Sequence, residues 1–176
     1  MASLFASSIG KAAFSRNPMY SVGKELHTVG TKFTFAGTGA NGDQYVLAGP
    51  LSLDDRVARI LTQSFPGLTS ATSNNLGFYY SKDALATQAG LVPVKSGGGN
   101  ELWSGVTLAT AVTTWQDLLT GKNGSLDNTK SIRDLLSLGP DAEPFGGIYL
   151  VLTVGTAQSA GGACDLDIQI EQATTR

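Results

Sequence analysis

Hydrophobic and polar positions alternate along this chain over short runs that glycine-rich turns separate. In the clearest run, near the C-terminus, Leu166, Ile168 and Ile170 alternate with polar residues, so one face of a strand packs inward. We predict strands at residues 32–36, 44–48, 57–63, 77–80, 102–108, 148–154 and 164–172. This number of short strands favours a mainly β protein, an antiparallel β-sandwich or a jelly roll.

The first 27 residues differ from the rest and predict an extended N-terminal arm. Apolar residues at helical spacing within the first fifteen positions indicate a short amphipathic helix, which Pro18 interrupts. Residues 1–24 contain no acidic residue and superficially resemble a transit peptide, but we favour an arm that docks onto a partner. The β domain is then residues 28–176. The arm residues predicted to make that contact are Phe5, Ile9, Phe14 and Tyr20.

A helical insertion is predicted between two strands, at residues 113–144. Thr114 and Asp117 have the spacing of a capping box, which predicts a helix over residues 115–120. Ser131 and Asp134 predict a second helical turn, which ends before Pro140. Insertions of this kind between strands often carry binding contacts.

The run at residues 148–154 is apolar at nearly every position, which predicts a strand buried on both faces. Charges are also scarce across residues 44–48 and 148–154, so open sheet edges there lack protection against uncontrolled pairing. A closed oligomer covers such edges. We therefore expect a self-associating protein.

Composition and charge exclude several classes of function. A chain of 176 residues, 41% of them hydrophobic, can bury the core of one domain. A net charge of -2 without a basic cluster argues against a nucleic-acid partner. No apolar run approaches the ~20 residues needed to span a bilayer, so no membrane contact is expected. One cysteine and one histidine cannot supply a zinc cluster, and we expect no metal and no cofactor.

Three patterns that resemble catalytic or binding motifs have simpler structural explanations. Residues 37–42 match G-x-G-x-x-G, but a strand follows them instead of a helix, so we predict a hairpin turn. Asp54 and Asp55 beside Arg56 are predicted to form a solvated turn between strands. His27 has no recognisable nucleophile or acid around it. We therefore predict no catalytic residue and no enzymatic activity.

The last predicted strand places its polar and apolar side chains on opposite faces. Cys164 shares a face with Leu166 and is predicted to be a small core residue without nucleophilic function. Asp165, Asp167 and Glu171 lie on the other face and lack the acidic loop of a calcium site. They form a solubilising or partner-facing stripe.

Aromatic residues leave a carbohydrate-binding alternative open. A platform for sugars is conceivable from Trp103, Trp115, Phe78, Tyr79 and Tyr80. Against it, residues 78–80 alternate between faces, so at least one of their rings lies in the core. Trp115, in a predicted short helix, is expected to anchor that helix on the sheet.

Residues 33–63 and 148–172 carry a further pattern. A polar turn ends in Gly42-Asp43, a strand leads to Pro50-Leu51, and Arg56-Val57 opens the next strand. Residues 148–172 contain a Leu-Thr-Val strand, a turn of small residues and a strand with Asp-Leu. Together these stretches resemble a recurring type of small virion protein of tailed bacteriophages, of the capsid decoration or cement type, and the second stretch looks like its closing hairpin.

This resemblance implies a structural protein on the capsid surface of a virion. Such a protein is made in the host cytoplasm, binds the major capsid protein, commonly assembles as a trimer and stabilises the head. The predicted helical insertion departs from the compact form of that type. Two alternatives follow, namely another virion part, such as a tail or head-tail connector protein, and a carbohydrate- or receptor-binding β-sandwich module.

Overall fold

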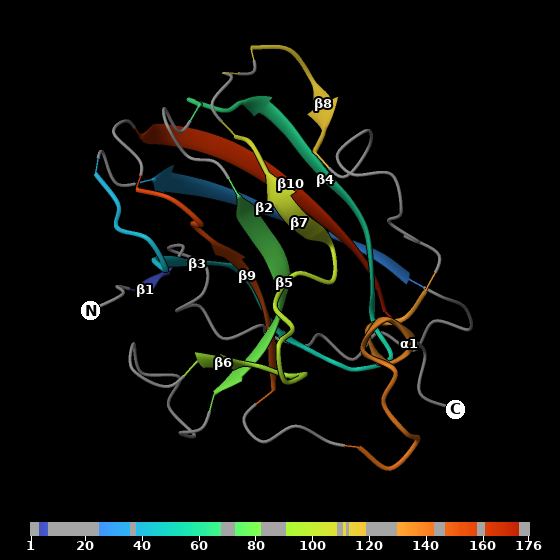
Figure 1. Cartoon of the computed structure of the whole chain (residues 1–176). Coiled ribbons are helices and arrows are strands. Elements are labelled where there is room, and N and C mark those ends of the chain that lie inside the picture. The colour runs from blue at the N-terminus through green and yellow to red at the C-terminus, as the bar shows by residue number, and fades with distance from the viewer. Residues whose placement is uncertain are drawn as a thin grey trace.

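In the part of the chain that it describes, the computed structural model contains two β-sheets that face each other and one short helix (Figure 1). It describes residues 4–6, 25–35, 38–67, 73–81, 91–108, 111, 113–118, 130–142, 147–157 and 161–172. The elements are β1 (Leu4–Ala6), β2 (Glu25–Phe35), β3 (Gln44–Leu51), β4 (Arg56–Ser64), β5 (Asn74–Ser81), β6 (Leu91–Pro93), β7 (Trp103–Val106), β8 (Gln116–Asp117), α1 (Ile132–Leu136), β9 (Ile148–Thr153) and β10 (Gly162–Gln172).

The strand order confirms the predicted mainly β, sandwich-like fold. One sheet has the order β1-β3-β9-β5-β6, with β7 also paired to β5, and the other has the order β2-β10-β4-β8. Among the described strands, every pair is antiparallel except β1 with β3. Each predicted strand overlaps an observed one, whereas β1, β6 and β8 were not predicted because two or three residues are too short for an alternating pattern.

The core lies between the two sheets and is rich in aromatic and branched side chains. The Phe35 ring packs edge-on against Tyr45, with centroids 4.9 Å apart, and against Phe65 at 5.5 Å. Cys164 is buried beside these strands, as predicted, and burial, with a smaller effect of the Asp165 charge, raises the pKa of its thiol to about 12. The alternating C-terminal residues Leu166, Ile168 and Ile170 are all buried.

One helical prediction is wrong because strand pairing takes its place, and another falls mostly outside the described residues. Of the helix expected within the first fifteen positions, the structure describes Leu4–Ala6, which form β1 along β3. At the predicted helix of residues 115–120 the chain forms β8, and the N–H of Leu118, directly after it, donates to the Ile60 carbonyl at 2.7 Å. The Asp117 carboxylate, the presumed capping group, accepts from the Ile60 N–H at 3.3 Å. The backbone groups thus find partners across the sheet instead of within a helical turn.

The second predicted helical turn is confirmed as α1. Ser131 is its N-cap, and its Oγ accepts from the Asp134 N–H at 3.2 Å. The helix is held on the β3–β4 turn, since the Ile132 and Arg133 N–H groups donate to the carbonyls of Asp55 and Leu53. The insertion therefore contains one short helix and one short strand among its described residues.

The glycine-rich turns predicted as hairpins instead carry the chain from one sheet to the other. β2 and β3 lie in different sheets, and so do β9 and β10. The two crossings lie side by side, because the Gly42 N–H donates to the Val154 carbonyl at 2.8 Å and the Val154 N–H donates to the Asp43 carbonyl at 2.9 Å. A strand, turn and strand in sequence do not reveal whether both strands join the same sheet.

β9 is buried on both faces, as predicted, but it is not a sheet edge. Leu150 faces the main core and Val151 faces a smaller outer cluster with Val46 and Tyr79. β9 pairs with β3 on one side and β5 on the other. The open edge that we expected at residues 148–154 is therefore wrong, and the charge-poor sequence of β9 reflects its central position.

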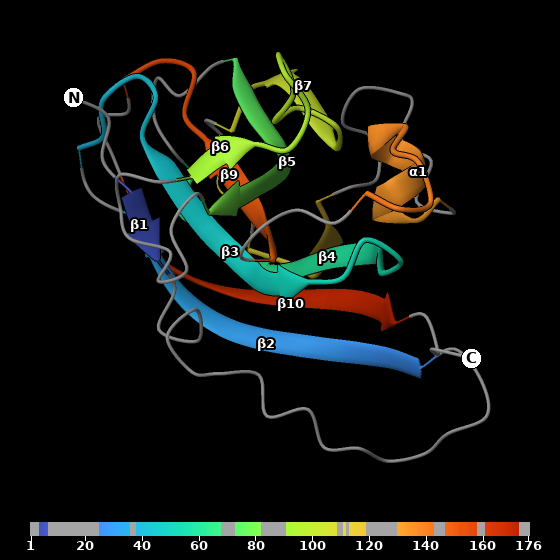
Figure 2. The ribbon, with the colours of Figure 1, turned by 90° about the horizontal axis from the view of Figure 1, so that it is seen from below.

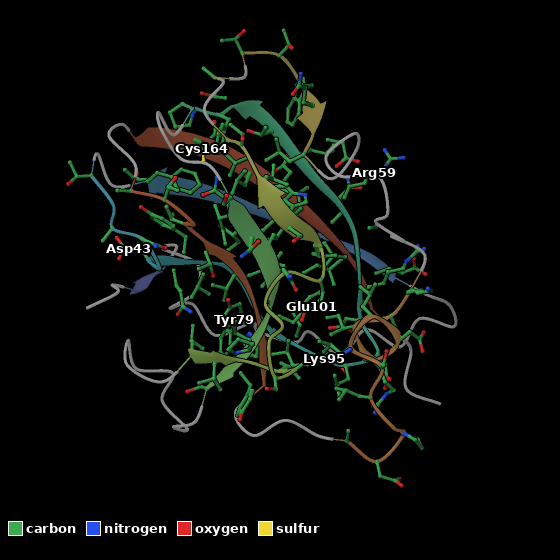
Figure 3. The ribbon with its side chains drawn as sticks, in the orientation of Figure 1. Asp43, Arg59, Tyr79, Lys95, Glu101 and Cys164 are labelled. Atoms are coloured by element: carbon green, nitrogen blue, oxygen red, sulfur yellow. The ribbon has the colours of Figure 1, made fainter. Side chains whose placement is uncertain are left out.

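The glycine-rich segment 95–101 packs on β5, between β6 and β7 (Figure 3). β6 and β7 pair with opposite ends of β5 and leave the Phe78 N–H in the gap, where it donates to Glu101 Oε2 at 3.0 Å. Glu101 Oε1 accepts from the Gly99 N–H at 2.9 Å. Glu101 thus supplies the acceptor that an unbroken strand would offer, and it holds the glycine-rich segment on the sheet.

Candidate binding surfaces

Trp115 is the clearest candidate for a binding contact among the described residues. It is the exposed large hydrophobic side chain there, at 58% exposure, and it immediately precedes β8, the last strand of the four-stranded sheet. Its neighbours Thr113, Thr114 and Gln116 are exposed and uncharged. We call residues 113–116 the Trp115 edge. A solvent-exposed tryptophan in uncharged surroundings is typical of an interface anchor.

The structure does not bring together the aromatic residues of the alternative sugar-binding platform. Phe78 and Trp103 lie in the main core and Tyr79 is buried in the outer cluster. Trp115 adjoins β8, which belongs to the opposite sheet from Trp103 in β7. The prediction that Trp115 anchors a helix onto the sheet is also wrong, because the side chain points to solvent. These positions remove the argument for a sugar-binding platform.

Asp54, Asp55 and Arg56 form a turn, but not the solvated turn that we predicted. Asp55 is buried, and its carboxylate accepts from the Ser52 N–H at 2.8 Å. Asp54 accepts from Arg133 Nε at 2.9 Å, and Arg56 forms an ion pair with Glu171. The Asp54 and Arg56 side chains join the turn to α1 and β10, whereas the Asp55 carboxylate closes the turn itself.

The carboxylates of β10 lie away from the core, as predicted, but they do not act as one stripe. Asp165 is exposed and Asp167 is half-buried, whereas Glu171 is occupied by its ion pair with Arg56. Within the described part of the chain, no group of three or more potential metal-ligating side chains lies together.

The predicted arm contacts fall largely outside the described residues. Phe5 lies in β1, opposite Tyr45 of β3, while Ile9, Phe14 and Tyr20 are outside the described residues. His27 lies in β2 and pairs with Ile170 across the sheet. The division into arm and β domain stays a prediction, although β2 begins at Glu25, inside the predicted arm.

The sequence reasoning missed Trp115 as an exposed residue. The local sequence also fits a helix, because Leu118 and Leu119 follow Trp115 at the i+3 and i+4 spacing of an apolar helix face. Polar and β-branched neighbours are instead typical of a short edge strand.

Comparisons with known proteins give little further information. No family model and no curated protein matches the chain. A chain of the solved "Cyanophage Pam1 capsid asymmetric unit" is similar, with 11% sequence identity and a TM-score of 0.43, over 89% of this chain and 91% of that chain. A likeness at this level carries no argument about function. No helix of the described residues is long and apolar enough to cross a membrane.

Proposed function

We propose that this chain is a structural protein of a tailed-phage virion that binds the capsid surface and stabilises the head as a decoration protein. In this proposal it acts by binding and not by catalysis, as a homotrimer whose principal partner is the major capsid protein. The Trp115 edge contacts that partner.

The arrangement of the two stretches that resemble such virion proteins is the observation that carries the proposal. Residues 33–63 and 148–172 are separated by residues 64–147, yet β3 pairs with β9, and β10 lies between β2 and β4. The two stretches therefore form one continuous block that spans both sheets (Figure 1). The two stretches that resemble such virion proteins are far apart in sequence but adjacent in the structure. This is expected if the resemblance reflects one structural unit.

The chemistry of the surface supports binding to a protein. Trp115 offers a large apolar area at the end of a rigid sheet, and its uncharged neighbours cost little to desolvate. Many weak contacts of this kind add up when several copies bind one particle.

The proposal is tested by adding the purified protein to phage capsids that lack it. We expect saturable co-sedimentation, a trimer in native mass spectrometry, and density on the outer capsid surface in electron microscopy. Trp115→Ala should weaken binding about 30-fold, the effect of losing roughly 2 kcal/mol at an interface anchor. Arg59→Ala, at an exposed position of β4, is the matched control and should bind normally.

Other outcomes identify the alternatives. A ring-shaped oligomer that binds tails or connectors but not capsids would favour another virion part. Binding to none of these particles, with specific retention on an immobilised glycan, would contradict the proposal and favour a carbohydrate-binding module.

A further inference from the structure

The first strand of the chain is attached to the sandwich differently from the others. β1 consists of three residues, Leu4–Ala6, and, alone among the described strands, it pairs in parallel, with Gln44–Val46 of β3. Residues 7–24, eighteen in number, connect it to β2. A short parallel pairing at the end of a long connection is weakly tied to its own chain.

The position of β1 gives the distance that residues 7–24 must span between β1 and the start of β2. Phe5 lies opposite Tyr45, and the Tyr45 ring contacts Phe35 at the end of β2. Glu25, where β2 begins, lies at its other end, paired with Gln172 (Figure 2). Ten residue steps at ~3.3 Å make these ends ~33 Å apart.

The connection is longer than this path requires. Eighteen residues span up to roughly 60 Å when extended, nearly twice the separation of the two ends of β2. The length of the connection therefore does not confine β1 to its own molecule. Exchange costs little enthalpy, because β1 makes the same hydrogen bonds on β3 of either molecule.

The edge of β3 is matched to β1, whichever copy supplies the strand. β3 pairs with β9 on one side, and β1 covers the start of its other side. Without β1, that side would expose backbone groups beside the buried residues Tyr45 and Val46. The strand whose sequence already fits this edge is residues 4–6 of the same protein.

We propose that β1 is exchanged between copies, so that Leu4–Ala6 of one chain completes the six-stranded sheet of another. The exchange links copies through their N-terminal segments and gives the oligomer a defined contact. It does not rest on capsid binding, since it is measured on the free protein.

The test uses cysteine pairs in full-length chains that carry Cys164→Ala. One chain carries Leu4→Cys and the other Gln44→Cys, which are register partners in β1 and β3. The two chains are co-expressed, treated with a short thiol cross-linker and separated by denaturing electrophoresis. Chains with Leu4→Cys and Gln116→Cys, at the exposed edge of the other sheet, are the matched control. Thermal unfolding confirms that each variant is folded.

Exchange predicts a shift of the Leu4→Cys and Gln44→Cys mixture from the mass of one chain to that of two, with no shift in the control. A parallel sample carries both substitutions in one chain. Cross-linking within that single chain, without cross-linking in the mixture, would show that β1 stays on its own molecule and would overturn the proposal. The absence of cross-linking in both samples would show that β1 does not occupy β3, which also overturns it.

Discussion

Adding one methyl group at Gly77 tests whether the 95–101 segment is seated on β5. Gly77 faces outward from the six-stranded sheet, between the inward-facing Leu76 and Phe78. A Cβ atom at Gly77 would lie 2.1 Å from Glu101 Oε2, 2.3 Å from the Gly99 carbonyl carbon and 2.6 Å from the Asn100 nitrogen. Two of these atoms belong to the backbone, so the Gly77→Ala variant must move the segment itself.

The size of the expected effect follows from the contacts that this movement disturbs. Relief of the clash with Gly99 requires a displacement of about 1 Å, and forced overpacking of this kind costs about 1–3 kcal/mol. The same displacement weakens the hydrogen bonds of Glu101 to the Phe78 and Gly99 N–H groups, and bonds to a charged group are worth about 1.5–3 kcal/mol each. Because these hydrogen bonds lengthen without being lost, we expect Gly77→Ala to lower the free energy of unfolding by about 2–4 kcal/mol in total.

Urea and thermal unfolding measure this loss against a matched control. For a chain of this length each kcal/mol lowers Tm by about 2–4 °C, so Gly77→Ala should melt roughly 4–16 °C below the wild type. Gly139→Ala adds the same methyl group where no atom lies within 4 Å, and it should change stability by less than about 0.5 kcal/mol. Equal stabilities of the two variants would refute the seating of the segment on β5.

Three further predictions concern the core, the thiol and the arm. Leu150→Asp places a charge at a fully buried position of β9 and should abolish cooperative folding at a cost of several kcal/mol, as measured by circular dichroism. Native Cys164 should resist a thiol reagent at pH 8 and react only after unfolding, because its pKa is raised to about 12. The folded state keeps this thiol protonated, so its contribution to stability is complete below the ordinary value of 9.0 and is lost as pH rises toward 12 in urea titrations. Deletion of residues 1–24 should preserve a cooperative thermal transition, and loss of that transition would show that the arm belongs to the core.

The alternation of apolar and polar residues predicted the long strands, because at each position the burial of the side chain determines whether the residue is apolar or polar. In β10 every second side chain from Cys164 to Ile170 is buried, so the period of two is visible in the sequence. The all-apolar run of β9 similarly reflects burial on both faces. For these elements the local pattern and the tertiary structure agree.

The remaining features depend on contacts between distant segments. Asp117 has the spacing of a helix cap, but in the structure its partner is β4. β4 is distant in sequence, so the residues around Asp117 do not reveal this pairing. The crossings between sheets likewise depend on the pairing of β3 with β9 and of β2 with β10. The exposure of Trp115 follows from the same edge pairing, so the candidate contact could not be placed before the strand order was known.

The two candidate contacts belong to different sheets, which separates their functions. β1 lies at the edge of the six-stranded sheet, whereas Trp115 adjoins β8 at the edge of the four-stranded sheet. A copy can therefore use β1 to bind another copy while its Trp115 edge remains available for a different surface. In the proposed exchange, linked copies present several Trp115 edges to one capsid. The affinity of the oligomer for the capsid then rises through multivalency, without a new interface. On this argument, deletion of residues 1–24 should weaken binding to capsids by separating the copies, whereas Trp115→Ala should weaken binding with the oligomer intact.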